Sequence, residues 1–264
     1  MKTLLVCQTE IANKFWQMEV NGASFTVSWG KVGTAGQVKI KEFESEEECL
    51  REASKLIRSK IKKGYVQNTT EENIIKRSNM TEDEMWALFD TAKTKGKDIE
   101  EQMEWLVTAL SRKSAADIIR FEDVFSHALN RSYTSHLWAA AYVVLGGCSD
   151  DAFDDFRAWL LYQGKDVYEA AIKQPETIIP ILEQVEKQGE MPMLEDLLLL
   201  SVYAFEEKTG LEDDHFYRLQ EQWNEKISEQ PEIEFDWDEE DEEELRRRFP
   251  LLWEKYGDSP FEYE

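Results

Sequence analysis

The chain contains few of the residues from which metal sites and disulfide frameworks are built. Three cysteines, widely spaced and odd in number, argue against a disulfide framework and for a reducing compartment. The three histidines form no HExxH or comparable ligand pattern. No glycine-rich fingerprint of the Rossmann or P-loop kind is present either. We therefore expect no metal and no other cofactor.

Long apolar runs are also missing. The apolar run nearest the N-terminus, Leu4 to Cys7, is too short for the hydrophobic region of a signal peptide. No run reaches the roughly 18 residues that a membrane-spanning helix needs. The sequence therefore predicts a cytoplasmic protein without a membrane partner.

Negative charge is abundant, but it is unevenly distributed. Residues 1–78 contain 13 Lys and Arg against 10 Glu, a net charge of +3, whereas residues 79–264 contain 18 basic and 45 acidic residues, a net charge of −27. Such asymmetry indicates two parts with different partners. Because an acidic surface repels a phosphate backbone, any contact with nucleic acid is expected in the first part.

The first part is predicted to be a small antiparallel sheet covered by one helix, over residues 1–66. Asn21-Gly22 favours a tight type I′ turn between two alternating segments. Ser45 and Glu48 form a capping box that begins the helix, and Gly64 follows its end. Four strands are expected, at Lys2–Gln8, Asn13–Val20, Ala23–Trp29 and Gly36–Phe43.

The second part is predicted to be all-α, which makes the chain α+β overall. A polar linker over residues 67–78 leads to an acidic helical domain at 79–230. Ser135 to Leu145 is apolar nearly all round and predicts a central buried helix. An acidic segment and a C-terminal helix follow at 231–264.

The glycine-rich stretch from Trp29 to Gln37 carries a family resemblance. It contains the triplet Trp29-Gly30-Lys31 and two further glycines, and it is followed by Lys41-x-Phe43 and by Lys62-Lys63-Gly64-Tyr65. With these motifs, residues 1–66 resemble a WGR domain. That family is named for Trp-Gly-Arg and occurs in DNA-dependent poly(ADP-ribose) polymerases and in many bacterial proteins. The resemblance implies nucleic-acid binding, in the polymerases at DNA ends.

The resemblance also implies roles for single residues. Trp29 would pack on a terminal sugar or base, while Gln37, Lys39 and Lys41 would lie near the backbone path. Lys31 stands where the family has Arg, so the charge is kept and the planar fork is lost. Two structural explanations stay open: Trp29 as a core residue that ends a strand, and the lysines as the solvated face of an edge strand.

A second chemically suggestive stretch begins at Gly146-Gly147. Two explanations are open for its acidic residues: an N-cap with first-turn carboxylates, or a small acidic site at a helix start. A nucleophilic cysteine there would need a lowered pKa, and no base can be named for it. The possible site comprises His136, Trp138, Cys148, Asp150, Asp151, Asp154 and Arg157, with His127 as a second candidate histidine.

Three motifs of the second part carry another resemblance. Met80 to Trp86, Leu137 to Tyr142 and Gly146 to Leu160 are similar to a bacterial domain of unknown function that is often found beside WGR domains. It implies a bacterial source but no activity. Further on, the acidic run from Glu232 to Glu244 predicts a solvated, partly disordered segment. The alternative is a phosphate mimic that docks on a basic partner, or on the WGR-like module and inhibits it.

We therefore expect a two-domain bacterial protein whose WGR-like module contacts DNA ends or structured nucleic acid, with a helical acidic domain as effector or regulator. One alternative is a protein-interaction or inhibitor module that binds a basic protein through the acidic domain. Another is an enzyme of unknown type at the Asp150–Arg157 region, although a non-enzyme is favoured.

Overall fold

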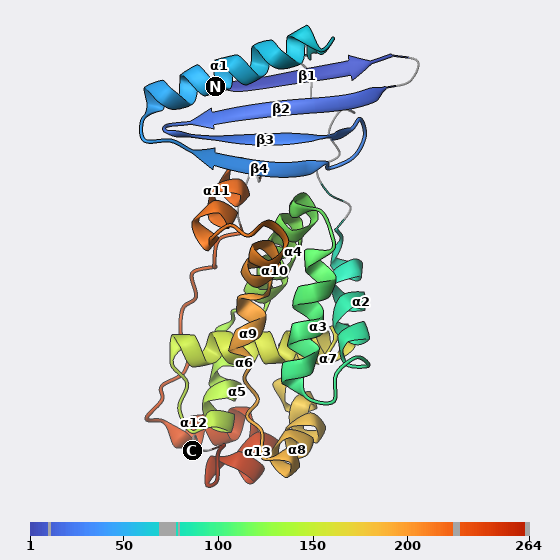
Figure 1. Ribbon diagram of the computed structural model, residues 1–264. Coiled ribbons are helices and arrows are strands. Elements are labelled where there is room, and N and C mark those ends of the chain that lie inside the picture. Colours follow the sequence, from blue (N-terminus) through green and yellow to red (C-terminus); the bar gives the residue numbers. More distant parts are fainter. Residues whose placement is uncertain (10–11, 69–77, 79, 224–227, 262–264) are drawn as a thin grey trace. The chain divides into compact units, whose positions relative to one another are not determined.

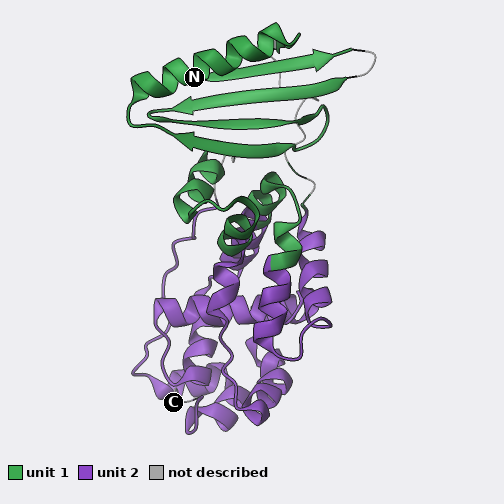
Figure 2. Cartoon of the chain, viewed as in Figure 1, with its two compact units in different colours: residues 1–80, 108–121, 202–223 green, residues 81–107, 122–201, 224–264 purple. Residues whose placement is uncertain are grey.

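The computed structural model describes residues 1–9, 12–68, 78, 80–223 and 228–261. The backbone clusters into two compact units (Figure 2). Unit 1 comprises residues 1–80, 108–121 and 202–223, and unit 2 comprises residues 81–107, 122–201 and 224–264.

Unit 1 contains a five-stranded antiparallel sheet with the strand order β4-β3-β2-β1-β5 (Figure 1). The α+β class is confirmed, and so are the four predicted strands. The fifth strand is not predicted, because three residues are too few to show an alternating pattern. The strands are β1 (Lys2–Gln8), β2 (Asn13–Asn21), β3 (Ser24–Lys31), β4 (Gln37–Glu42) and β5 (Val66–Asn68).

The hairpin between β2 and β3 turns one residue later than the sequence predicts. Asn21 pairs with Ser24, so the turn residues are Gly22 and Ala23. Gly22 has a φ of +55°, a left-handed conformation that glycine adopts without a side-chain clash. The alternation of the two strands is unaffected, and their apolar side chains share one face as predicted.

That apolar face is covered by α1 (Glu46–Lys62). Ser45 begins the helix by accepting a hydrogen bond from the Glu48 amide at 3.2 Å. Cys49 and Ala53, both fully buried, face the sheet. Together they close a core with Leu5, Trp16, Met18, Val20, Phe25 and Val27.

The other face of the sheet contacts α11 (Asp213–Trp223), which also belongs to unit 1. Ser24 and Glu42 are paired across β3 and β4. Because side chains alternate along a strand, they face away from the side of Phe25. Arg218 donates to Ser24 Oγ at 3.1 Å and to Glu42 Oε1 at 3.2 Å. Helices of unit 1 thus contact the sheet on both faces.

The rest of the described chain is helical, as predicted. A capping box is formed at Thr81, because Thr81 and Glu84 exchange hydrogen bonds. A helix at Ile179–Gln188 was not predicted. The helices are α2 (Glu82–Ala92), α3 (Ile99–Ser111), α4 (Ala115–Arg131), α5 (Ser135–Leu145), α6 (Asp150–Tyr162), α7 (Lys165–Lys173), η1 (Pro175–Ile178), α8 (Ile179–Gln188), α9 (Glu195–Leu198), α10 (Leu200–Thr209), α12 (Glu242–Arg248), α13 (Pro250–Leu252) and η2 (Trp253–Gly257).

Helix α5 is the buried centre of unit 2, as its apolar sequence predicts. Leu137, Ala140 and Val144 have no exposed surface. Gly146 ends the helix with a φ of +65°. Among the residues that the structure describes, no helix is long and apolar enough to cross a membrane.

The acidic segment before α12 is solvated, as its charge predicts, since its carboxylates are exposed. It is nevertheless anchored to α5. The Trp237 indole donates to the Ser135 carbonyl at 3.1 Å. The Phe235 ring lies edge-on to Trp138, with centroids 5.0 Å apart. Two aromatic residues within the acidic run therefore fix the segment, and net charge alone does not reveal this.

Candidate nucleic-acid interface

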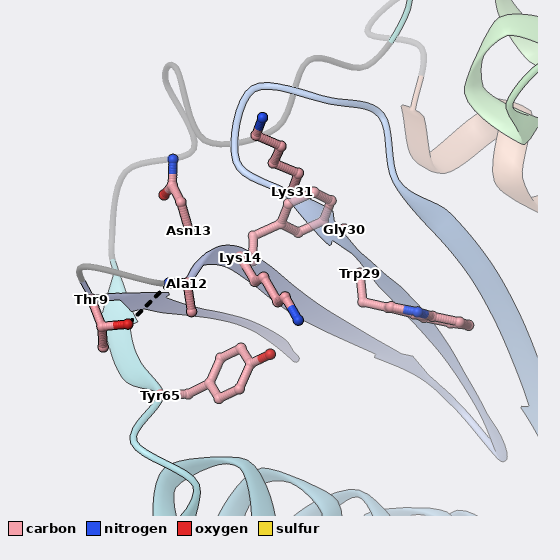
Figure 3. Close-up of a pocket in the computed structure, with 9 residues that line it drawn as sticks. Thr9, Ala12, Asn13, Lys14, Trp29, Gly30, Lys31 and Tyr65 are labelled. Carbon is pink, nitrogen blue, oxygen red and sulfur yellow. Dashed lines mark hydrogen bonds between the residues drawn. The ribbon is translucent and has the colours of Figure 1, made fainter.

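A hollow of about 550 Å³ opens at one end of the sheet (Figure 3). We call it the strand-end hollow. It lies where β2 begins and β3 ends, and Tyr65 joins it from the segment before β5. Its lining residues are Thr9, Ala12, Asn13, Lys14, Phe15, Trp29, Gly30, Lys31 and Tyr65.

Two glycines shape the backbone beside this hollow. Gly36 has a φ of +74°, and a β-carbon on it would lie 2.6 Å from the Trp29 carbonyl oxygen and 2.7 Å from the Phe15 ring. A β-carbon on Gly30 would lie 2.7 Å from the α-carbon of Gly36. Contacts this short are not tolerated, so glycine is required at both positions. The close approach holds the end of β3 against the start of β4 and thereby fixes the position of Trp29.

Trp29 and Lys14 provide the aromatic and cationic groups of the hollow. Trp29 is half-buried: it packs against the core under α1 and still lines the hollow. Lys14 is exposed, and in Figure 3 its amine points into the space between the Trp29 and Tyr65 rings. An indole beside an ammonium group can receive a base or sugar on the ring and a phosphate on the cation.

Lys60 of α1 contacts the Tyr65 ring, although it does not itself line the hollow. Lys60 Nζ lies 5.3 Å from the centroid of the Tyr65 ring and 5.4 Å from that of Trp16. Burial lowers the pKa of this lysine, and the nearby charge of Lys63 lowers it further. The two rings hold the ammonium group by cation–π attraction, which orients it without consuming its charge.

The five residues predicted to bind nucleic acid share one face of the sheet. Trp29 is paired with Gln37, Val27 with Lys39 and Phe25 with Lys41, and residues directly opposite one another in an antiparallel pair share a face. Lys31 continues the alternation of Trp29 along β3.

Their positions on that face nevertheless differ. Trp29 and Lys31 line the strand-end hollow, whereas Gln37 and Lys39 line a second hollow that Trp29 also borders. The Lys41 amine lies over the Phe43 ring, 4.7 Å from its centroid. In Figure 3 the exposed Lys31 side chain extends away from Trp29. The prediction that these residues bind nucleic acid stays a prediction.

Sequence reasoning missed Lys14 and Tyr65. The signal for Lys14 was present, because it continues the alternation of Trp16 and Met18 and therefore projects on the same face as Trp29. The position of Tyr65 carried no such signal. It depends on β5, whose pairing with β1 returns the chain to this end of the sheet.

Comparisons with known proteins agree with this architecture. The model of the WGR family matches residues 2–72. The family model thus finds a WGR domain in this segment. A second family model, described as a protein of unknown function (DUF4240), matches residues 80–207. The resemblances drawn from the sequence are thereby confirmed for both parts of the chain, and WGR domains in general bind nucleic acid.

The names of individual proteins that are similar to this chain state no activity. The chain is 51% identical over 65 residues to the uncharacterised protein YfeS, and 39% identical over 69 residues to the protein YehF, both of Escherichia coli K12. These matches cover 25% and 26% of the chain, and it spans about a quarter of the length of each relative. A protein of Bacteroides fragilis with a known crystal structure has 34% sequence identity to this chain. The match covers 38% of this chain and 30% of that protein's chain, with a TM-score of 0.27.

In the segment that matches DUF4240, structural contacts hold both terminal nitrogens of Arg157, whereas its buried Nε has no hydrogen-bond partner among the described residues. Its side chain is 1% exposed, it donates to the Leu129 carbonyl at 2.8 Å, and it pairs with Asp154. The guanidinium lies over the rings of Tyr133 and Phe153, at 4.7 and 4.9 Å from their centroids. It therefore ties α6 to α4.

The other members of the possible acidic site also make structural contacts. Ser149 caps α6 by accepting from the Ala152 amide, with Asp150 and Asp151 exposed in the first turn. Trp138 donates to the Cys148 carbonyl, and the His136 ring packs on Phe249. The pKa of His136 is lowered, mainly by burial and to a lesser extent by the positive charge of Arg248.

These contacts favour the structural explanation that the sequence left open. No group of three or more His, Cys, Asp or Glu side chains in the described part of the chain is arranged to hold a metal ion. An enzyme at this stretch stays a prediction.

Cys148 is expected to be unreactive in the folded protein. Burial is the main cause that raises the pKa of its thiol to about 12, and Asp154 adds to the effect. A pKa raised from the ordinary value lowers the thiolate fraction near neutral pH, and the thiolate is the reactive form. Iodoacetamide at pH 8, followed by peptide mass spectrometry, should modify Cys148 only after denaturation. Labelling of the folded protein at the rate of free glutathione would contradict this expectation.

Proposed function

We propose that this protein binds nucleic acid through its WGR domain, at the strand-end hollow. The observation that carries the proposal is the arrangement of the half-buried Trp29 ring beside the Lys14 amine, with Tyr65 on the other side. Aromatic stacking tolerates any base, and lysine recognises phosphate as a point charge. The hollow therefore suits the end or an unpaired nucleotide of a strand rather than a particular base sequence.

The charge distribution supports this assignment. The net charge is +3 over residues 1–78 and −27 over the remainder. A net positive charge is thus found only over residues 1–78, and the affinity for nucleic acid is expected to depend strongly on local cations. Binding that rests on few phosphate contacts loses affinity as salt rises, with a slope of about 0.9 per phosphate on duplex DNA and about 0.7 on a single strand.

The test is fluorescence anisotropy with the full-length chain and three labelled ligands: blunt duplex DNA, nicked duplex DNA and single-stranded RNA, at two salt concentrations. The proposal expects micromolar or tighter binding at low salt and a preference for at least one ligand with an exposed end or interruption over an end-free circular duplex used as competitor. Equal competition by the circular duplex would remove the end-binding part of the proposal. The absence of binding to every ligand would remove the proposal altogether.

Neutralising both lysines that line the strand-end hollow should weaken binding. For Lys14→Gln with Lys31→Gln we expect about a 10-fold loss of affinity and a salt slope lower by about 1 to 2, because one or two phosphate contacts are lost. Lys95→Gln with Lys97→Gln is the matched control, since it makes the same charge change at exposed lysines of unit 2. Equal behaviour of the two double variants would show that net charge, and not the hollow, decides binding.

A further inference from the structure

A second hollow, of about 530 Å³, runs along the outer strand β4. We call it the β4-edge hollow. Lys39 and Gln37 line it from the sheet, and helical residues of unit 1 line it from the other side. Those residues come from the α3–α4 connection, with Arg112 and Lys113, and from the end of α10, with Lys208.

The charge of this hollow is of one sign. Its lining contains four cationic side chains and no Asp or Glu. This is unusual for the chain, because residues 79–264 contain 45 acidic against 18 basic residues. Three of the four cations come from that acidic part, so they form a local exception to its composition.

The neighbouring carboxylates are already engaged. Asp117 accepts hydrogen bonds from Ser114 and Ser78, with 2.6 and 2.7 Å between the oxygen atoms. Glu207 accepts from the Ser111 hydroxyl at 3.0 Å. Lys208 donates to the Ser111 carbonyl at 3.0 Å, which uses one of its three ammonium hydrogens. Both carboxylates keep their charge, but neither lines the hollow, so the surface that a ligand would meet there is cationic.

Trp29 connects the two hollows, because it lines both. A nucleotide stacked on its ring would have Lys14 in the one hollow and the cations Lys39, Arg112 and Lys113 in the other. A strand that continues past Trp29 carries a phosphate at each step, and each phosphate needs a cation to replace its released counterions. The second group of cations provides such partners.

We infer that the β4-edge hollow binds the phosphates of a nucleic-acid strand that continues past Trp29, with Arg112 and Lys113 as contacts supplied from outside the WGR domain. The inference rests on the proposed function of the strand-end hollow. It assigns a role in binding to a part of the DUF4240 domain, whose family description names no function. Arg112 can bind a phosphate through two parallel hydrogen bonds, whereas the lysines provide point charges.

The test uses the full-length chain with Arg112→Gln and Lys113→Gln combined. The ligand is a labelled duplex DNA with a single-stranded overhang. We expect a 5- to 10-fold loss of affinity and a salt slope lower by about 1 to 2, because two cations are removed from the phosphate path. Lys95→Gln with Lys97→Gln, which makes the same charge change outside both hollows, should change affinity less than about 2-fold. Circular dichroism melting checks that each variant is folded.

The possible outcomes distinguish the failure of this inference from the failure of the proposed function. If the wild type binds and Trp29→Ala or the Lys14 and Lys31 variant weakens it, while the Arg112 and Lys113 variant matches the control, the inference is overturned and the proposed function stands. If the wild type does not bind, both fall. An affinity loss with an unchanged salt slope would also overturn the inference, because phosphate neutralisation would not be its cause.

Discussion

Trp29→Ala is expected to lower the affinity for nucleic acid by roughly 5- to 150-fold. That range corresponds to the 1 to 3 kcal/mol that stacking of one base on an aromatic side chain contributes. The upper part of the range is expected here, because Trp29 lines both hollows and its loss removes the ring that connects them. The salt slope should change little, since no cation is removed. Anisotropy titrations at two salt concentrations measure both quantities.

The control for Trp29→Ala must remove an aromatic ring of the same unit without touching either hollow. Tyr203→Ala meets this requirement, because Tyr203 is 41% exposed and belongs to unit 1. Trp29→Phe adds a second comparison, since it keeps a smaller ring and should lose less affinity. Wild-type affinity in folded Trp29→Ala would mean that binding is electrostatic and that the tryptophan serves only the core.

The sequence predicted the fold of the WGR domain well, because its signals are local. Alternation gave the strands, the Ser45 cap gave the start of α1, and the glycines gave the turns. The turn at Gly22 was misplaced by one residue, since Asn21-Gly22 and Gly22-Ala23 both place a glycine where a positive φ is needed. Helix α8 was missed although its buried residues Leu182 and Val185 have helical spacing.

The candidate site was predicted less completely, because it depends on contacts between distant residues. The candidate roles of Trp29, Lys39 and Lys41 came from the family resemblance, and the strand register then places these residues on one face. The presence of Arg112 and Lys113 beside Lys39 did not, since about 70 residues separate them in the chain. The acidic composition of residues 79–264 even argued against any cationic surface there. Net charge averages over a domain, whereas a ligand meets one surface of it.

Gly36→Ala is expected to destabilise the WGR domain by about 3 kcal/mol or more. Two costs combine. An alanine in the left-handed region costs about 1 to 2 kcal/mol, and its β-carbon would overlap the Trp29 carbonyl and the Phe15 ring, an overpacking that costs about 1 to 3 kcal/mol. Because the overlap involves backbone, it cannot be relieved by a side-chain rotation. Hydrogen exchange followed by mass spectrometry, on peptides from β2 to β4, reports this loss locally.

Gly33→Ala separates the two costs. Gly33 has a φ of +82°, similar to the +74° of Gly36, but a β-carbon on it would meet no atom within 4 Å. Gly33→Ala should therefore lower the free energy of unfolding only by the 1 to 2 kcal/mol that backbone strain costs. This variant should keep wild-type binding. Gly36→Ala should also lose binding, since the clash displaces Trp29 from both hollows. If both variants lost the same stability, the close approach of β3 and β4 would not be what holds Trp29, and the glycines would act as turn formers alone.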